Sequence, residues 1–132
     1  MKPFRNYTLP ALVWMAGIFV SSSIPGEDFP DVGFWGWAKL IHLFYYCVLC
    51  FLIYRTLLYH MRSPALFRHA FLVAILLATV YGATDELHQL YTPGRHGQFS
   101  DVLIDGLGAS LFWVGSKVHS VTRPKEAPTK HS

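Results

Sequence analysis

The segment AKLIHLFYYCVLCFLIYRTLL, residues Ala38–Leu58, is long and apolar enough to cross a lipid bilayer as a single helix. A membrane-spanning helix needs about 20 consecutive, mainly apolar residues. Three other apolar stretches accompany it, and two of them reach this length only if they include acidic residues near one end. The sequence therefore predicts an all-α protein, an integral membrane four-helix bundle, with spans at about residues 7–23, 38–58, 66–90 and 101–118.

The composition indicates the same class. Hydrophobic residues make up 52% of the 132-residue chain and charged residues 14%, whereas a soluble domain carries about 25% charged residues. This balance excludes a disordered chain and a nucleic-acid-binding tail, and it disfavours a soluble domain, which needs more charge to cover its surface. We interpret Cys47 and Cys50, which lie inside the apolar segment, as small buried side chains rather than a redox or zinc site.

The first apolar stretch allows two interpretations. Lys2 and Arg5, the apolar run after them and the serines at 21–23 also resemble a secretory signal peptide, so a cleaved signal is the alternative to the retained helix that we expect. Short segments with proline or glycine separate the spans, and the Pro93-Gly94 pair predicts a type II turn before the last one. Residues 120–132 are predicted to form a polar cytoplasmic tail.

The basic residues are divided unequally between the two predicted sides of the membrane. Only Lys39 and Arg95 fall on one side, which carries seven of the eight acidic residues. The side of the termini holds the other nine basic residues: Lys2, Arg5, Arg55, Arg62, Arg68, Lys117, Arg123, Lys125 and Lys130. The positive-inside rule then predicts a multi-pass membrane protein with both termini in the cytoplasm. The aromatic run Phe34–Trp37 predicts an interfacial patch on the outer surface, with a binding lip as the alternative.

Polar side chains gather at the predicted outer ends of the spans. Lys39, His42 and Tyr46 share one face of the second span, and Asp101 and Asp105 share one face of the fourth. Because charged groups inside a membrane are costly, they mark a functional site. We expect these side chains to meet in one pocket with polar residues from the other two spans and the last loop. Those residues are Ser21, Ser22, Ser23, Asp85, Glu86, His88, Gln89, Arg95 and His96.

Several of these residues also have a purely structural interpretation. Asp101 follows Ser100 and can stabilise the start of a helix. Lys39 can extend its ammonium group to the membrane surface. Four more residues can be explained without a site, by a water-exposed rim position for Asp85 and His88, a packing role for His42, and an ordinary loop position for Arg95.

The residue types in this pocket are suited to three kinds of chemistry. Arg95, Lys39 and His42 would bind an anion such as a phosphate or a carboxylate. A carboxyl group of Glu86 or Asp105 that is removed from water can serve as a general acid or base. Glu86, Asp101, Asp105 and His42 also offer ligands to a divalent metal. We nevertheless expect no cofactor, because the chain has no HExxH, P-loop or paired CxxC motif.

At these residues the sequence resembles the VanZ-like family of small bacterial membrane proteins. TDELHQLYTPGRHGQFSDVLIDGLGASLF, Thr84–Phe112, is similar to that family's acidic residue and glutamine, Gly-Arg turn, Ser-Asp-Val and Gly-x-Gly. KLIHLFYY, Lys39–Tyr46, resembles its Asp-Lys-x-x-His with a tyrosine four residues on, and SSSIP, Ser21–Pro25, its Ser-x-Pro. The chain departs from the pattern with Ala38 where aspartate is frequent and with Asp105 where asparagine is common.

The resemblance implies a four-span protein of the bacterial cell envelope, located in the plasma (inner) membrane. The family's namesake is linked to lowered susceptibility to teicoplanin, a lipoglycopeptide. The resemblance implies a site made of Lys39, His42, Tyr46, Glu86, Gln89, Arg95, Asp101 and Asp105. We assign catalytic roles to Glu86, Asp105 and His42, and substrate or anion binding to Lys39, Arg95, Gln89, Tyr46 and Asp101.

Three functional hypotheses follow. The first is a non-catalytic protein that binds an anionic envelope molecule, such as a membrane lipid, a lipid-linked envelope precursor or a glycopeptide antibiotic. The second is a membrane-embedded enzyme that hydrolyses or transfers a lipid-linked phosphate headgroup. The third, a small ion-coupled carrier or assembly subunit, is disfavoured because no buried charge reaches the inner half of any span. We expect no nucleic-acid partner.

Overall fold

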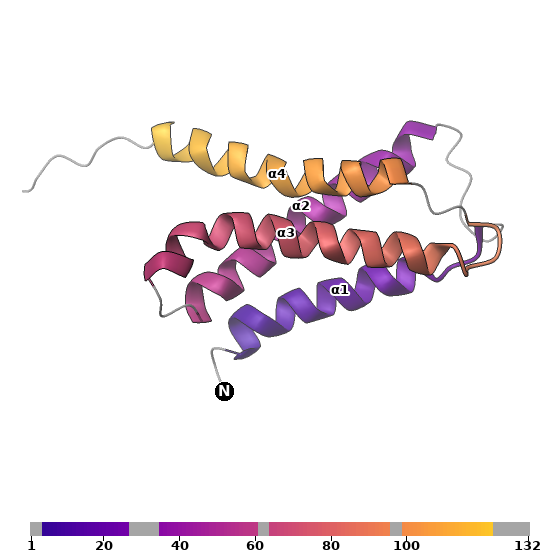
Figure 1. Ribbon diagram of the computed structural model, residues 1–132, viewed down its shortest axis with the longest axis horizontal. Coiled ribbons are helices and arrows are strands. Elements are labelled where there is room, and N and C mark those ends of the chain that lie inside the picture. The colour runs from indigo at the N-terminus through magenta and orange to yellow at the C-terminus, as the bar shows by residue number, and fades with distance from the viewer. Residues whose placement is uncertain (1–3, 27–34, 61–63, 96–98, 123–132) are drawn as a thin grey trace, which may run out of the picture.

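The computed structural model describes residues 4–26, 35–60, 64–95 and 99–122 (Figure 1). A short π-helical turn, η1 (Phe4–Thr8), leads into α1 (Leu9–Ser22), which is followed by α2 (Trp35–His60), α3 (Pro64–Gln89) and α4 (Phe99–Thr122). The described residues contain no β-strand, so the prediction of an all-α, four-helix fold is confirmed. α2 and α4 extend beyond the predicted spans at both ends, α2 by residues 35–37 and 59–60 and α4 by residues 99–100 and 119–122.

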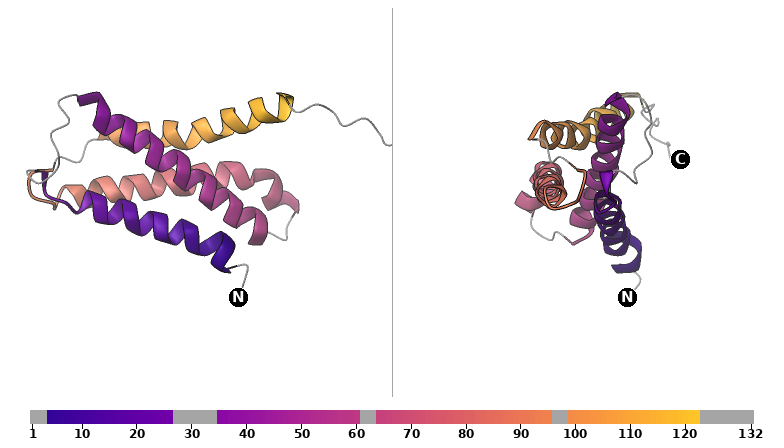
Figure 2. Two further views of the ribbon diagram at one scale, coloured as in Figure 1. Left: turned by 180° about the vertical axis from the view of Figure 1, so that it is seen from behind. Right: turned by 90° about the vertical axis from the view of Figure 1, so that its right-hand side faces the viewer.

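The second helix occupies the centre of the molecule. Figure 2 shows α2 crossing the other helices at an angle, and it packs against all three of them. α1 and α4 each pack against α2 and α3, whereas no contact joins α1 to α4 within the described ranges. α2 and α3 therefore form the central pair, and polar side chains on them can meet residues from either outer helix.

Small side chains let the helices approach closely. On α3 a stripe of small residues at four-residue intervals is buried: Ala70, Ala74, Ala78 and Gly82. On α4, Gly108 lies so close to α2 that an added Cβ would overlap the carbonyl group of Leu43 and lie 3.0 Å from its Cα. Sequence spacing favours a different position, because Gly106 and Ser110, four residues apart, form the small-xxx-small pattern that is typical of closely packed membrane helices. A Cβ on Gly106 would meet only Thr79, with the hydroxyl oxygen at 3.4 Å, so the closest contact is at Gly108.

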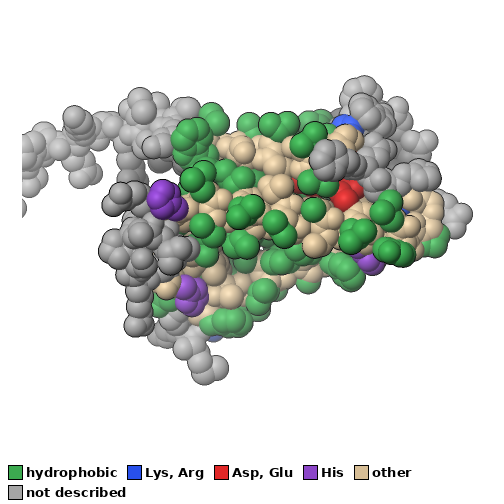
Figure 3. All heavy atoms as spheres, viewed as in Figure 1, with side chains coloured by type: hydrophobic (Ala, Val, Ile, Leu, Met, Phe, Trp, Pro, Cys, Tyr) green, Lys and Arg blue, Asp and Glu red, His purple; other side chains and the backbone are tan. Residues whose placement is uncertain are grey.

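Large apolar side chains cover the outside of the helices (Figure 3). On α3 and α4 their exposed fractions lie between 44% and 62% for Leu72, Leu76, Leu77, Val80, Leu103, Leu107, Leu111 and Val114. Water-soluble monomers rarely expose an apolar surface of this extent. Two helical segments in the described part of the chain, Lys39–His60 and His69–Gln89, are long and apolar enough to cross a membrane. Membrane crossing itself stays a prediction for all four helices.

The connection after α3 is a tight turn that is fixed to the end of α1. The Arg95 amide donates to the Thr92 carbonyl at 3.1 Å, and Gly94 has a φ of 70°. Both features confirm the turn predicted from Pro93-Gly94. The Gly26 amide donates to the Pro93 carbonyl at 3.0 Å, so the turn is held against the segment that follows α1. The predicted aromatic patch begins at Phe34, and this residue and most of the predicted tail, residues 123–132, lie outside the described ranges.

Candidate functional site

Charged side chains meet at one end of the bundle, where α1 and α3 end and α2 and α4 begin. We call this the site end. The outermost pair joins α2 to α4, because Lys39 Nζ donates to Asp101 Oδ1 at 2.6 Å. Both side chains are about one-fifth exposed, at 18% and 19%. Lys39 is thus engaged by a carboxylate of its own chain. The chain has Ala38 where the VanZ-like pattern often has aspartate, and the lysine pairs with Asp101 on α4 instead.

One helical turn deeper, three ionisable side chains from three helices converge. His42 Nδ1 on α2 lies 3.1 Å from Asp105 Oδ1 on α4 and 3.8 Å from Glu86 Oε1 on α3. Asp105 is fully buried, and the Glu86 side chain is 7% exposed. The imidazole therefore bridges two carboxylates inside the bundle. We call these three residues the His–acid cluster.

A glycine on α3 makes room for the buried aspartate. A Cβ on Gly82 would lie 2.6 Å from Asp105 Oδ2, so a larger residue would displace this carboxylate. No described residue offers a hydrogen-bond partner to Asp105 Oδ2 or to the equally buried hydroxyl of Tyr46. Such an unsatisfied buried polar atom costs about 1–3 kcal/mol unless a ligand or water supplies the bond.

A second buried carboxylate joins α3 to the end of α1. Ser22 Oγ donates to Asp85 Oδ1 at 2.6 Å, and Gln89 Nε2 donates to Asp85 Oδ2 at 3.2 Å. Asp85 is only 4% exposed, so the interpretation that places it at a water-exposed rim is wrong. The rotation of α3 that points Glu86 inward also turns Asp85 toward α1. His88 is half-buried and stacks on Phe19, outside this hydrogen-bond network.

The Ser22→Ala substitution is expected to lower the free energy of unfolding by about 2 kcal/mol, because it removes a hydrogen bond to a buried carboxylate. Thermal unfolding of the purified protein in detergent measures the effect. Ser23→Ala is the matched control, since the exposed Ser23 hydroxyl bonds the Phe19 carbonyl and His88 Nε2 but no buried carboxylate. We expect the control to change stability by less than about 0.5 kcal/mol. Equal losses in both variants would contradict a specific role for the bond to Asp85.

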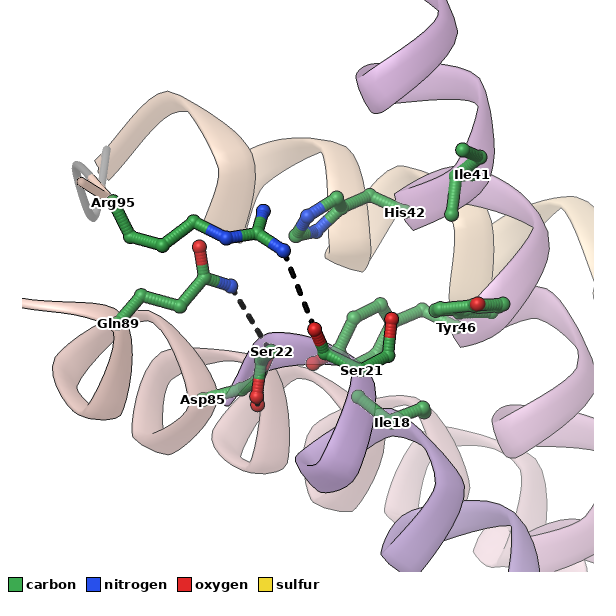
Figure 4. A pocket seen from close by; sticks show the side chains of 10 residues that line it. Ile18, Ser21, Ser22, Ile41, His42, Tyr46, Asp85, Gln89 and Arg95 are labelled. Atoms are coloured by element: carbon green, nitrogen blue, oxygen red, sulfur yellow. Dashed lines mark hydrogen bonds between the residues drawn. The ribbon is translucent and has the colours of Figure 1, made fainter. Parts of the chain in front are cut away.

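Arg95 follows the Pro93-Gly94 turn and closes the pocket from the side. Its guanidinium group donates to the Ile24 carbonyl at 3.1 Å and to the Ser21 carbonyl at 3.3 Å. Figure 4 shows its side chain extending toward His42 above Gln89 and Asp85. The pocket holds about 40 Å³, room for a few water molecules, and its polar lining is Ser21, Ser22, His42, Tyr45, Tyr46, Asp85, Gln89 and Arg95.

The structure brings together most of the residues that the sequence singled out. His42, Tyr46, Gln89 and Arg95 line one pocket, and Glu86 and Asp105 contact His42 beside it. Lys39 and Asp101 form a separate pair nearer the surface and do not line this pocket, so Lys39, His42 and Arg95 do not form one cationic group. His96 lies outside the described residues.

Two features of the site are not evident from sequence. Ser22 holds Asp85 in place, and only its membership of a serine run at the end of a span indicates a polar role. Gly82 admits the Asp105 carboxylate, and its place on the same face as Glu86 is the available signal. In both cases the partner lies on another helix, so local spacing does not reveal it.

A comparison with protein families finds a match to the VanZ/LLP1 family over residues 7–119. No curated protein and no solved structure matches the chain. The matched region includes every residue of the His–acid cluster, the Lys39–Asp101 pair and the pocket. It also agrees with the resemblance noted in the Thr84–Phe112 segment. Because the match extends over most of the sequence, the chain belongs to the VanZ/LLP1 family.

Proposed function

We propose that this chain is a multi-pass protein of the bacterial plasma membrane whose pocket binds the phosphate or carboxylate group of an anionic envelope molecule. One observation carries the proposal. Buried charged and polar side chains from three helices and a fixed turn meet around a small pocket, inside a bundle whose outer surface is apolar. Ionisable groups in such surroundings are expensive and commonly mark a binding or reaction site.

The distribution of charge supports an orientation with the site end outside. Nine of the eleven basic residues fall on the side of the termini and the α2–α3 connection. Cytoplasmic segments carry such an excess of lysine and arginine. A pocket at the opposite end would then meet envelope lipids and lipid-linked precursors at the outer face of the membrane.

The size of the pocket favours a compact group. A volume of about 40 Å³ admits a phosphate-sized group after small side-chain movements, but it does not admit a whole glycopeptide. A contribution to teicoplanin-type resistance would therefore arise through an envelope lipid that the protein engages. Arg95 is the basic side chain best placed to contact the anion, because it lines the pocket and can offer parallel N–H donors.

Binding of a long-chain polyprenyl phosphate to the purified protein tests this proposal. We expect the phosphate to bind at least about tenfold more tightly than the corresponding alcohol, because a charge-assisted contact contributes about 1.5–3 kcal/mol. Arg95→Ala should remove most of that preference. Arg55→Ala is the matched control, since Arg55 lies beside Tyr7 and Phe51 at the other end of the bundle. Equal affinity for phosphate and alcohol would contradict the proposal.

A second candidate function is hydrolysis or transfer of a lipid-linked phosphate headgroup. The observation that favours it is the His–acid cluster beside Arg95, which pairs a proton acceptor with a phosphate ligand. In hydrolysis, a water oxygen bonds to phosphorus and its proton passes to Glu86. The bond from phosphorus to the lipid oxygen breaks, and that oxygen takes a proton from water to leave as the alcohol. Release of labelled inorganic phosphate by the parent chain, and by Arg55→Ala but not Glu86→Gln, would select this function over simple binding.

A further inference from the structure

We propose that His42, Glu86 and Asp105 bind a divalent transition-metal ion. One potential ligand atom from each residue, His42 Nδ1, a Glu86 carboxylate oxygen and an Asp105 carboxylate oxygen, lies within 4.8 Å of the other two. In a tetrahedral or octahedral site, neighbouring ligand atoms are about 3 Å apart. The two distances from His42 Nδ1, 3.1 and 3.8 Å, are close to this spacing. Small side-chain rotations would therefore place an ion among the three atoms.

An independent observation points to a ligand at the same place. Asp105 has no exposed surface, and its second carboxylate oxygen has no hydrogen-bond partner among the described residues. The hydroxyl of Tyr46, one turn below His42 on α2, is likewise buried without a described partner. Native helix bundles rarely leave buried polar atoms without a hydrogen-bond partner. A bound ion with its remaining water or anion ligands would supply partners to both.

The balance of charge at the site end also fits a cation. Among the described residues of the site, four carboxylates, Asp85, Glu86, Asp101 and Asp105, accompany two permanently charged basic groups, Lys39 and Arg95. Three of the carboxylates are at most 5% exposed, in surroundings where unbalanced charge is costly. A divalent ion would offset this excess of negative charge and present a positive centre to the pocket.

The donor set restricts the identity of the ion. One imidazole nitrogen with two carboxylate oxygens suits Zn²⁺ or Mn²⁺, whereas Mg²⁺ and Ca²⁺ take oxygen ligands. Three protein ligands leave at least one coordination position for water or for an anion. Mn²⁺ has the further advantage as a probe that it binds weakly to thiols, and Cys47 and Cys50 are free on the same helix.

This inference goes beyond the proposed function, because the ion would be held whether or not a lipid phosphate enters the pocket. A bound ion would also explain how an acid-rich pocket accepts an anion, because its open coordination position would take a phosphate oxygen beside Arg95. The two proposals fail separately. Metal binding without any preference for lipid phosphate would remove the proposed function and leave the metal site intact.

The test uses the full chain, purified in detergent, stripped with EDTA and then dialysed against MnCl₂ or ZnCl₂. We expect about one ion per chain by elemental analysis, and a rise in the unfolding temperature on adding the ion. Asp105→Asn and Glu86→Gln, which keep the side-chain shape, should each weaken binding at least about tenfold and abolish the rise. Asp101→Asn is the matched control on α4. Although the sequence also offers Asp101 as a metal ligand, the structure pairs it with Lys39 and groups only His42, Glu86 and Asp105 around the proposed ion.

The possible results lead to distinct conclusions. Stoichiometric binding that is retained in Asp101→Asn and lost in both cluster variants supports the site. The proposal is overturned if the parent chain binds neither ion, or if Asp105→Asn and Glu86→Gln bind as tightly as the parent. It is also overturned if Asp101→Asn loses as much affinity as they do, because the effect would then reflect the general negative charge of the site end.

Discussion

The Gly108→Ala variant is expected to unfold several degrees below the parent chain. An added methyl group at this position would overlap the backbone carbonyl of Leu43, and backbone atoms cannot move aside as the end of a flexible side chain can. α2 and α4 must separate instead, and overpacking of this kind costs about 1–3 kcal/mol. Alanine recovers up to about 1 kcal/mol through its higher helix propensity, which reduces the loss without cancelling it.

Thermal unfolding in detergent measures this effect, and the chain offers two matched controls. Gly106→Ala adds a methyl group two residues away on the same helix, where it would meet the Thr79 hydroxyl at 3.4 Å. Gly17→Ala adds one on α1, where no described atom lies within 4 Å apart from its chain neighbours and the nearby backbone of the same helix. Neither control should lower the unfolding temperature as Gly108→Ala does. If all three glycines tolerate alanine equally, the close approach of α2 and α4 at Leu43 is not a determinant of stability.

The same contact between α2 and α4 positions the site. Lys39 and His42 on α2 pair with Asp101 and Asp105 on α4 in two successive helical turns. Gly108 lies one turn further along α4, so it sets the helix separation on which both pairings depend. Separation of these helices in Gly108→Ala would lengthen the distance between His42 and Asp105. A change in the site is therefore expected together with the loss of stability.

Hydropathy and spacing predict the helices and the face of each that carries the polar residues. Four apolar stretches predict four helices, because a run of about 20 mainly apolar residues is the length that a helix needs to cross a bilayer. Spacing of three, four and seven residues places Lys39, His42 and Tyr46 on one face of α2. The structure brings that face against α4.

Partner identity depends on rotation and register between helices, which local sequence does not specify. The engagement of Lys39 by Asp101 is an example, since spacing alone leaves open whether Lys39 binds an anion or extends to the surface. Asp85 is another: its neighbour Glu86 points toward α2, and the burial of Asp85 is explained by its hydrogen bonds to Ser22 on α1 and to Gln89. The position of Gly82 under Asp105 likewise requires the packing of α3 against α4.

Replacement of His42 by leucine is expected to destabilise the protein by about 3 kcal/mol in the presence of EDTA, because it leaves a fully buried carboxylate without its charged or hydrogen-bonding partner. Asp105→Asn in the His42→Leu background should recover at least half of that loss, since the amide carries no charge. The double-mutant cycle separates this charge effect from the packing of the imidazole ring.

The outcome of this cycle depends on how His42 stabilises the bundle. The imidazole packs beside Tyr46, with ring centroids 6.3 Å apart, so part of the loss in His42→Leu could come from missing ring contacts. Leucine has a similar volume and fills most of that space, which keeps the packing contribution small. If the stability losses of His42→Leu and Asp105→Asn add in the double variant, the energetic cost of burying the Asp105 charge does not depend on His42. Partial recovery in the double variant, measured by chemical or thermal unfolding, would instead show that the imidazole balances the buried carboxylate.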